Sequence, residues 1–307
     1  MPAHIVHIGY HKTATTWLQE CVFPSATSHV WTARAVTQQA FLRAPGLHFD
    51  AGEARRVLGL DGEPARALLL SEENLSGYLH NAGLHGLLAP EMARRIHATM
   101  PGAQIVITIR NQQDICRAAY AQYVSGGGTW GPGRYFDTAS KVRGALTRPW
   151  KAPAFGFEHF EFDRLIGWYD NLFGREQVHV YPYEWLSDRA ALLARMQADL
   201  GLELAYDVKA DKRANPSLGP VAQTVLRGVN LFTRQSVINK DVLVDLPGGQ
   251  FLRHGVKAAL AAVPGMNRQA ATLPASIRAR IAAHYPESNR RLLALRDLPL
   301  AELGYPL

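Results

Sequence analysis

Short runs of β-branched and aliphatic residues recur along the 307-residue chain and predict β-strands. The predicted strands are 4–10, 67–71, 104–110 and 177–183. From Ile105 to Ile109 the apolar residues are almost continuous, which is typical of a strand that helices cover on both faces. The pattern therefore favours a mainly parallel sheet at the centre of the fold.

Segments with helical spacing separate these strands, as crossover connections between parallel strands require. Helices are predicted over 15–22, 90–100, 114–124 and 162–173. A later helix is expected to have Ser187 as its N-cap and to end before Gly201. Another, over 276–295, contains Pro286, which should kink or divide it. This alternation predicts an α/β fold with a single domain over 1–307.

Two regions do not follow the alternation. Residues 124–160 combine several glycines with scattered aromatic residues and are too irregular for one long element. Such a long loop is commonly a lid or a binding loop, so we predict a substrate loop here, whose aromatic residues either face a substrate or pack the loop down. Residues 219–273 are basic in places and contain no motif that indicates a function. We expect an insertion there with helical segments.

The charge balance indicates an anionic ligand. Lysine and arginine number 33 against 26 aspartate and glutamate residues, which gives a net charge of +7. Nucleic acid, an acidic glycan, a membrane surface and a phosphorylated nucleotide would all suit this sign. We do not expect nucleic acid, because the basic residues are dispersed and no nucleic-acid-binding motif accompanies them.

Cysteine content and hydropathy predict the compartment. Cys21 and Cys116 are far apart and have no partner at metal-ligand spacing, so neither a disulfide framework nor a zinc site is expected. The sequence contains no leader-like segment and no apolar run of about 18 residues, so no transmembrane segment is predicted. We expect a cytoplasmic protein. No pattern indicates its oligomeric state.

The strongest local motif is HIGYHKTATTWL at 7–18, a predicted strand that runs into a turn and a helix. At a helix start, backbone N–H groups lack intrahelical partners and the helix dipole adds positive potential. An anion could bind there beside Lys12 and the hydroxyls of Thr15 and Thr16. The alternative is an ordinary turn with a capping threonine. A Walker A loop is not indicated, because its lysine directly precedes the Ser or Thr that holds Mg²⁺.

This stretch resembles the 5′-phosphosulfate-binding loop of sulfotransferases that use 3′-phosphoadenosine 5′-phosphosulfate (PAPS). That loop reads close to KxGTT, and HKTGTT in many bacterial members, and it follows the first strand as it does here. The similarity continues at 68–76, 105–123 and 162–186 and near the C-terminus, but it does not cover 219–273. Ala14 stands where the family usually has glycine. We expect its backbone to avoid the left-handed region that glycine tolerates.

The resemblance implies a fold and a reaction. The fold would be P-loop-like, with three layers in which helices flank a central parallel sheet. PAPS would be the co-substrate, no metal ion would be required, and the acceptor would carry a hydroxyl group. We favour a carbohydrate acceptor, because aromatic residues of the predicted substrate loop could stack on sugar rings. A lipid, a phenol or another small hydroxylated metabolite remains an alternative.

The resemblance also implies roles for the loop residues. Lys12 would contact the transferring sulfuryl group or the bridging oxygen, and Thr15 and Thr16 would hold the 5′-phosphate. Trp17 would either stack on adenine or belong to the core. The predicted nucleotide-binding loop consists of Tyr10, His11, Lys12, Thr13, Ala14, Thr15, Thr16 and Trp17.

A base must take the proton of the acceptor hydroxyl. The stretch SEENL at 71–75 follows a predicted strand, and the family pattern places Glu73 in its acidic position. We predict Glu73 as the base, with Glu72 as the alternative. His11 is a further candidate, although a histidine beside a phosphate loop is expected to be protonated and to act as a donor.

The 3′-phosphate is expected beside Arg110, at the end of a buried strand. An unpaired charge there would be costly, so its partner is either this phosphate or an internal carboxylate. Family members usually pair the arginine with a serine on the next helix, where this chain has Ala118. Arg213 lies in a segment similar to another nucleotide-contacting region, and it is predicted to add a contact.

Two other functions are consistent with the motif. A P-loop nucleotide kinase-like enzyme would share the architecture but would need Mg²⁺ with a nucleoside triphosphate. A non-catalytic nucleotide-binding protein would bind without turnover, and the departures at Ala14 and Ala118 keep this alternative open.

Overall fold

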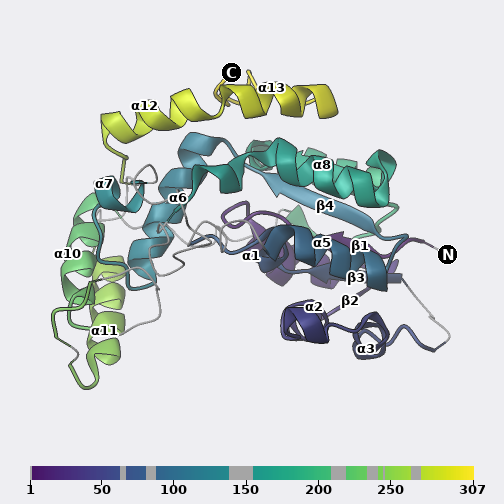
Figure 1. Ribbon diagram of the computed structural model, residues 1–307, viewed down its shortest axis with the longest axis horizontal. Helices are drawn as coiled ribbons and strands as arrows, with labels where there is room; N and C mark the ends of the chain where they lie inside the picture. Colours follow the sequence, from purple (N-terminus) through teal and green to yellow (C-terminus); the bar gives the residue numbers. More distant parts are fainter. Residues whose placement is uncertain are drawn as a thin grey trace.

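The computed structural model describes residues 2–62, 67–80, 88–137, 155–208, 219–233, 241–244, 246–263 and 271–307. A five-stranded sheet lies at its centre (Figure 1). Its strands are β1 (Ile5–His7), β2 (His29–Trp31), β3 (Ala67–Ser71), β4 (Gln104–Ile109) and β5 (Val178–Pro182). Their order is β2-β3-β1-β4-β5, and every neighbouring pair is parallel. The predicted parallel sheet is confirmed.

Strand β2 is the one that the sequence pattern does not predict. It has only three residues, and its middle residue Val30 is 43% exposed. So short a segment shows neither an apolar run nor a clear alternation. It lies at the edge of the sheet, where Val30 is paired with Leu68 of β3. Pairing with β3, rather than its own pattern, makes this segment a strand.

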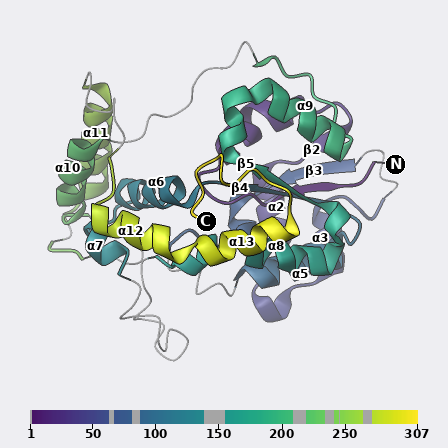
Figure 2. The same cartoon turned by 90° about the horizontal axis from the view of Figure 1, so that it is seen from above.

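Helices cover both faces of the sheet (Figure 2). The covering helices include α1 (Thr15–Trp17), α5 (Leu88–Thr99), α8 (Phe162–Phe173) and α9 (Arg189–Leu200). Ile105 and Ile107 of β4 belong to the core shared with α5 and α8, whereas Val106 belongs to the core shared with α1 and α9. Successive β4 residues thus point into opposite cores, which explains the continuous apolar run. The three-layer α/β fold is confirmed.

Three further helices agree with the predicted segments more closely in their interiors than at their ends: α6 (Gln112–Ser125), α12 (Ala275–His284) and α13 (Pro286–Leu295). Helices α2 (Arg34–Phe41) and α3 (Ala51–Val57) were not predicted. Pro286 divides the last helical region as predicted, and Gly201 ends α9 with φ of 60°. The predicted cap of α9 is wrong. Ser187 lies inside a 3₁₀ turn, and Asp188 caps the helix by accepting from Ala191 N at 3.0 Å.

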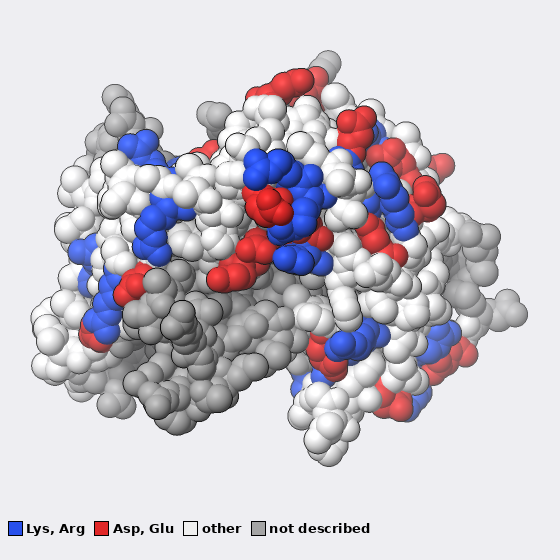
Figure 3. Space-filling view, turned by 45° about the horizontal axis from the view of Figure 1, so that its top comes forward, with Lys and Arg blue, Asp and Glu red and all other residues white. Residues whose placement is uncertain are grey.

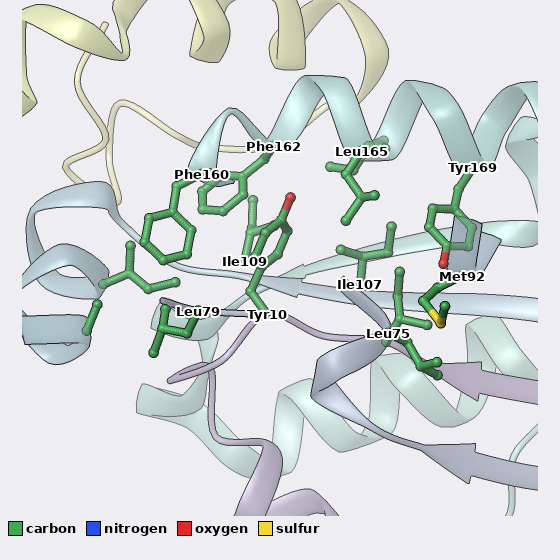
Figure 4. Packing of buried hydrophobic residues seen from close by; sticks show 14 of the residues in the cluster. Tyr10, Leu75, Leu79, Met92, Ile107, Ile109, Phe160, Phe162, Leu165 and Tyr169 are labelled. Atoms are coloured by element: carbon green, nitrogen blue, oxygen red, sulfur yellow. The ribbon is translucent and has the colours of Figure 1, made fainter. Parts of the chain in front are cut away.

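The larger core lies between the sheet and α8 (Figure 4). Tyr10, which follows β1, points into this core, where its ring centroid lies 4.9 Å from that of Phe162 and 5.8 Å from that of Phe160. Only 2% of Tyr10 is exposed. The Tyr10 side chain is therefore a core residue, and only its backbone contributes to the loop that precedes α1.

The two irregular regions are described in part. In the predicted substrate loop, 138–154 lies outside the described residues, and the described aromatic side chains are buried: Trp130, Tyr135, Phe136, Phe155, Phe157 and Phe160. Except for Trp130, these rings pack against one another, and the role of the loop toward a substrate stays a prediction. Region 219–273 contains α10 (Pro220–Asn230) and α11 (Gly249–Ala262), and α10 packs on α6. No helix in the described ranges has both the length and the apolar character needed to span a bilayer.

Candidate functional site

The loop between β1 and α1 is tied to the end of β4. Tyr10 N donates to Thr108 O at 3.2 Å, and the hydroxyl of buried Thr13 lies 2.6 Å from Thr108 Oγ1. A Cβ at Gly9 would lie 2.0 Å from the same Thr108 hydroxyl, so only glycine fits this close approach. The Thr13 side chain therefore anchors the loop to the sheet.

Lys12 and Ala14 have left-handed backbone conformations, with φ of 68° and 65°. No other described non-glycine residue has positive φ. The expectation for Ala14 is therefore wrong: the turn needs this conformation so that Ala14 O can accept from Leu18 N at 3.1 Å and begin the helix. An L-residue in this region costs roughly 1–2 kcal/mol. Such strain is concentrated at functional sites.

Replacing Ala14 by glycine is expected to stabilise the protein. Glycine relieves the left-handed strain, and its extra freedom in the unfolded chain offsets only part of that gain, so the free energy of unfolding should rise by about 0.5–1 kcal/mol. Urea denaturation measures this change. Ala282→Gly, at an exposed position inside α12, is the matched control and should lose about 1 kcal/mol. Equal losses in both variants would contradict the strained conformation of Ala14.

The start of the helix places its side chains in different surroundings. Thr15 and Trp17 are buried, whereas Thr16 is exposed. Trp17 packs in the smaller core, where its Nε1 donates to the Tyr206 hydroxyl at 3.1 Å and the Arg189 guanidinium lies 5.3 Å from its ring centroid. Trp17 therefore packs in this core, and its stacking on adenine stays a prediction.

A small pocket lies beside the loop, next to β5. Its lining includes Ala14, Trp17, Tyr183, Leu186 and Met196. These side chains are mostly apolar. The pocket and the loop share Ala14, so the pocket lies directly beside the loop.

Two cationic residues, Lys12 and Arg110, contact each other at the loop. Arg110, directly after β4, donates from Nη1 to the Lys12 carbonyl at 3.0 Å, and its guanidinium lies 4.0 Å from the Tyr183 ring centroid. Its Nε is buried without a hydrogen-bond partner among the described residues. No described carboxylate forms an ion pair with Arg110, and both oxygens of Glu184 accept from other groups. The internal-carboxylate alternative for Arg110 thus finds no partner in the described chain.

The Lys12 ammonium group experiences a positive environment. Desolvation lowers the pKa of Lys12, and Arg110 lowers it further. Glu73 opposes this shift, and Lys257 of α11 adds a smaller lowering effect. Lys257 belongs to region 219–273, in which the sequence alone indicated no function. A positive potential from several cations suits a ligand with several negative charges.

The two glutamates after β3 have different surroundings. The Glu72 side chain is 0% exposed, and its oxygens accept from Arg34 at 2.7 and 2.9 Å. Burial alone would raise the pKa of Glu72, but Arg34 and the other donors hold it below its ordinary value. Glu73 is 15% exposed, and its oxygens accept from Arg34 at 2.7 Å and Gln19 at 3.1 Å. Glu72 is therefore a structural carboxylate, whereas Glu73 is partly accessible.

His11 is buried beside these glutamates. Its Nε2 lies 3.1 Å from Asn74 Oδ1, and its Nδ1 is buried without a partner among the described residues. Burial lowers the pKa of His11, although Glu73 and Asn74 oppose the shift. Burial thus disfavours the charged ring in the protein without a ligand, and the expectation of a protonated His11 beside a bound phosphate stays a prediction. Burial also lowers the pKa of His80 and of His159 to about 3, with a smaller contribution from His11.

The structure thus gathers most of the predicted site residues at one edge of the sheet. The loops after β1, β3 and β4 carry Lys12, Glu73 and Arg110, and these loops leave the carboxyl ends of parallel strands. Ala118 is half-buried in α6, and Arg213 lies outside the described residues. The sequence interpretation missed Arg34, because it predicted no helix α2. It also passed over Asn74, although this residue stands in the quoted SEENL stretch.

No protein-family model and no curated protein matches this chain. Among solved structures, the sulfotransferase from Alicyclobacillus acidocaldarius aligns over 99% of each chain at 16% identity, with a TM-score of 0.52. The sulfotransferase domain from the curacin biosynthetic pathway aligns over 100% of this chain and 99% of its own at 11% identity and a TM-score of 0.39. Mouse sulfotransferase SULT7A1 complexed with PAP aligns over 96% and 88% at 14% identity and a TM-score of 0.36. The last two scores are too low to bear on the fold, but the first shows that this chain has the fold of a sulfotransferase.

Proposed function

We propose that this protein transfers a sulfuryl group from PAPS to an acceptor hydroxyl. The observation that carries the proposal is the meeting of Lys12 and Arg110 at the loop after β1, where Arg110 has no carboxylate partner within the described ranges. Ligands of open α/β sheets bind outside the carboxyl ends of the strands, where this loop lies. The resemblance of 7–18 to a phosphosulfate-binding loop supports the same assignment.

The chain's residues suggest how the donor would bind. Backbone N–H groups of the loop before α1, with the Thr15 and Thr16 hydroxyls, would hold the 5′-phosphate. Arg110 would bind the 3′-phosphate, and the adenine ring would lie near Tyr183 and Leu186. Because Lys12 and Arg110 supply positive charge at the phosphates, we propose that binding needs no metal ion.

Transfer would proceed in line between two oxygens. The bond from sulfur to the 5′-phosphate oxygen breaks, its electron pair stays on the phosphate, and the acceptor oxygen bonds to sulfur. Lys12 would stabilise the charge that develops on the leaving phosphate. A base must take the acceptor proton, and the two candidates are Glu73 and His11, whose pKa the Glu73 charge raises.

For the acceptor we propose a carbohydrate hydroxyl. On the face drawn in Figure 3, the described lysine and arginine side chains are interspersed with aspartate and glutamate. Incubation with ³⁵S-labelled PAPS and sets of neutral sugars, acidic sugars, phenols and lipids would identify the class. Labelling of phenols or lipids alone would contradict the carbohydrate proposal.

The nucleotide product, 3′-phosphoadenosine 5′-phosphate (PAP), is expected to stabilise the protein in the presence of EDTA. A ligand that binds only the folded state stabilises it by RT ln(1 + [L]/Kd), which is about 2.7 kcal/mol at 100 times Kd. Thermal unfolding with and without PAP measures the effect, with adenosine as the control ligand that lacks both phosphates.

Two other results would support the alternative functions. Stabilisation by ATP with Mg²⁺ but not by PAP would favour the kinase-like enzyme. Stabilisation by PAP without transfer to any acceptor of the four sets would favour a non-catalytic nucleotide-binding protein. An unfolding temperature that millimolar PAP does not change would contradict the assignment of the loop.

A further inference from the structure

A chain of hydrogen bonds runs from helix α2 to the loop after β1. Arg34, the first residue of α2, donates from Nε to Glu72 Oε2 at 2.7 Å, and Gln38 one turn later donates to the same oxygen at 2.6 Å. Glu72 Oε1 accepts from both the backbone N and the side-chain Nδ2 of Asn74, at 3.0 and 2.7 Å. Asn74 Oδ1 then lies 3.1 Å from His11 Nε2. This series of hydrogen bonds therefore ends at His11, one of the two candidate bases.

The donors and acceptors in this series of hydrogen bonds determine which nitrogen of His11 carries the proton. Glu72 is held as a carboxylate by Arg34 and can only accept, so the Asn74 group facing it must be the NH₂. The Asn74 group facing His11 is consequently the carbonyl oxygen, which can only accept as well. His11 Nε2 must then donate, and in a neutral imidazole the other nitrogen, Nδ1, carries the lone pair.

The Nδ1 atom is the one without a partner. It is buried, and no described residue bonds to it. A buried acceptor with no donor is costly, unless a ligand supplies one. An acceptor hydroxyl would supply that donor. By contrast, both oxygens of Glu73 already accept hydrogen bonds, one from Arg34 and one from Gln19.

We propose that His11 Nδ1 takes the proton of the acceptor hydroxyl, and that Asn74, held by Glu72, is the positioning residue that fixes this tautomer. The inference rests on the proposed sulfuryl transfer and chooses between its two candidate bases. The acceptor O–H bond breaks, its proton moves to Nδ1, and its electron pair forms the new O–S bond. The imidazolium that results keeps its Nε2–H bond to Asn74 Oδ1, with the Glu72 carboxylate behind it.

The charged and titratable groups around His11 set the pH range in which it can act. Those that influence it, or that it influences, are Lys12, Glu72, Glu73, His80 and His159. Burial and Lys12 favour the neutral ring, which is the form that can accept a proton. Activity should therefore rise with pH through the pKa of His11, because the protonated ring cannot act as a base.

Nitrogen NMR of the histidine-labelled full chain tests the tautomer without any acceptor. In the wild-type protein at neutral pH, the Nδ1 resonance of His11 should be that of an unprotonated nitrogen and the Nε2 resonance that of a protonated one. Asn74→Ala should remove this preference and give a mixture of tautomers. A wild-type His11 that carries its proton on Nδ1 would overturn the inference, whatever the variants do.

The pH dependence of transfer tests the base. Asn74→Ala removes a hydrogen bond that raises the pKa of His11, so the rising limb of the kcat/KM profile should move to lower pH. Transfer is measured from PAPS to the best substrate of the acceptor screen. Glu73→Gln should keep the limb and also move it to lower pH, because the Glu73 charge raises the pKa of His11; a limb lost in Glu73→Gln would make Glu73 the base. Asn74→Ala should also lower kcat about tenfold or more without moving the PAP affinity.

Binding of PAP separates this inference from the proposed function. A wild-type protein that binds no PAP contradicts sulfuryl transfer itself. A protein that binds PAP and transfers sulfate, but whose rising limb is unmoved in a folded Asn74→Ala variant, keeps its function and contradicts only the role of His11.

Discussion

The Lys12→Ala variant is expected to transfer sulfate about 10²–10³-fold more slowly than the wild-type protein, which is the usual loss when one group that stabilises developing charge is removed. The Lys12 ammonium group would act on the leaving phosphate, whose charge grows only as the bond to sulfur breaks. The affinity for PAP should therefore fall less than the rate of sulfate transfer. Single-turnover transfer from ³⁵S-labelled PAPS gives the rate, and calorimetric titration with PAP gives the affinity.

Lys12→Ala should keep the backbone conformation, because alanine already occupies a left-handed position two residues later. Lys12 and Ala14 have φ of 68° and 65°, so Lys12→Ala removes the side chain and leaves the backbone strain nearly unchanged. Lys12→Arg keeps the charge but changes the shape of the donor, and it should recover part of the rate. A Lys12→Ala variant that transfers sulfate at the wild-type rate would exclude Lys12 from the reaction.

The core of the fold was predictable because it follows from local patterns. The unbroken apolar run at 105–109 requires cover on both faces, and β4 indeed contributes to two separate cores. Strand β2 was not predictable in this way. It takes its structure from pairing with β3, which is a tertiary contact that leaves no periodic signal in three residues.

The candidate site was predictable only where the motif itself specified it. The motif located Lys12 in the chain, but its backbone conformation depends on how the turn is tied to Thr108 of β4. The motif also led to the wrong backbone conformation for Ala14. A preference for glycine at this position does not show which conformation an alanine adopts there. The charge of His11 depends on burial, and its tautomer depends on Asn74, which is a neutral residue that a search for ionisable groups passes over.

The Arg110→Ala variant is expected to lose about 10–100-fold in affinity for PAP, since hydrogen bonds to a charged group contribute about 1.5–3 kcal/mol. Arg110 is well prepared for such a bond. The ring of Tyr183 and the carbonyl of Lys12 hold its guanidinium, and its Nε is buried without a partner in the described chain. A 3′-phosphate would provide the missing acceptor. Calorimetric titration with PAP measures the loss.

Adenosine 5′-phosphosulfate, which lacks the 3′-phosphate, distinguishes a binding role of Arg110 from a structural one. Because Arg110 also bonds to the Lys12 carbonyl, its removal could disturb the loop and weaken every nucleotide. A phosphate-specific role requires that Arg110→Ala weaken PAP far more than adenosine 5′-phosphosulfate. Ala118→Ser restores the serine usual in the resembling family, and one neutral hydroxyl should change PAP affinity less than about tenfold. Equal losses for both nucleotides in Arg110→Ala would mean that this arginine holds the loop, and the 3′-phosphate site would then have to lie elsewhere, with Arg213 as the next residue to replace.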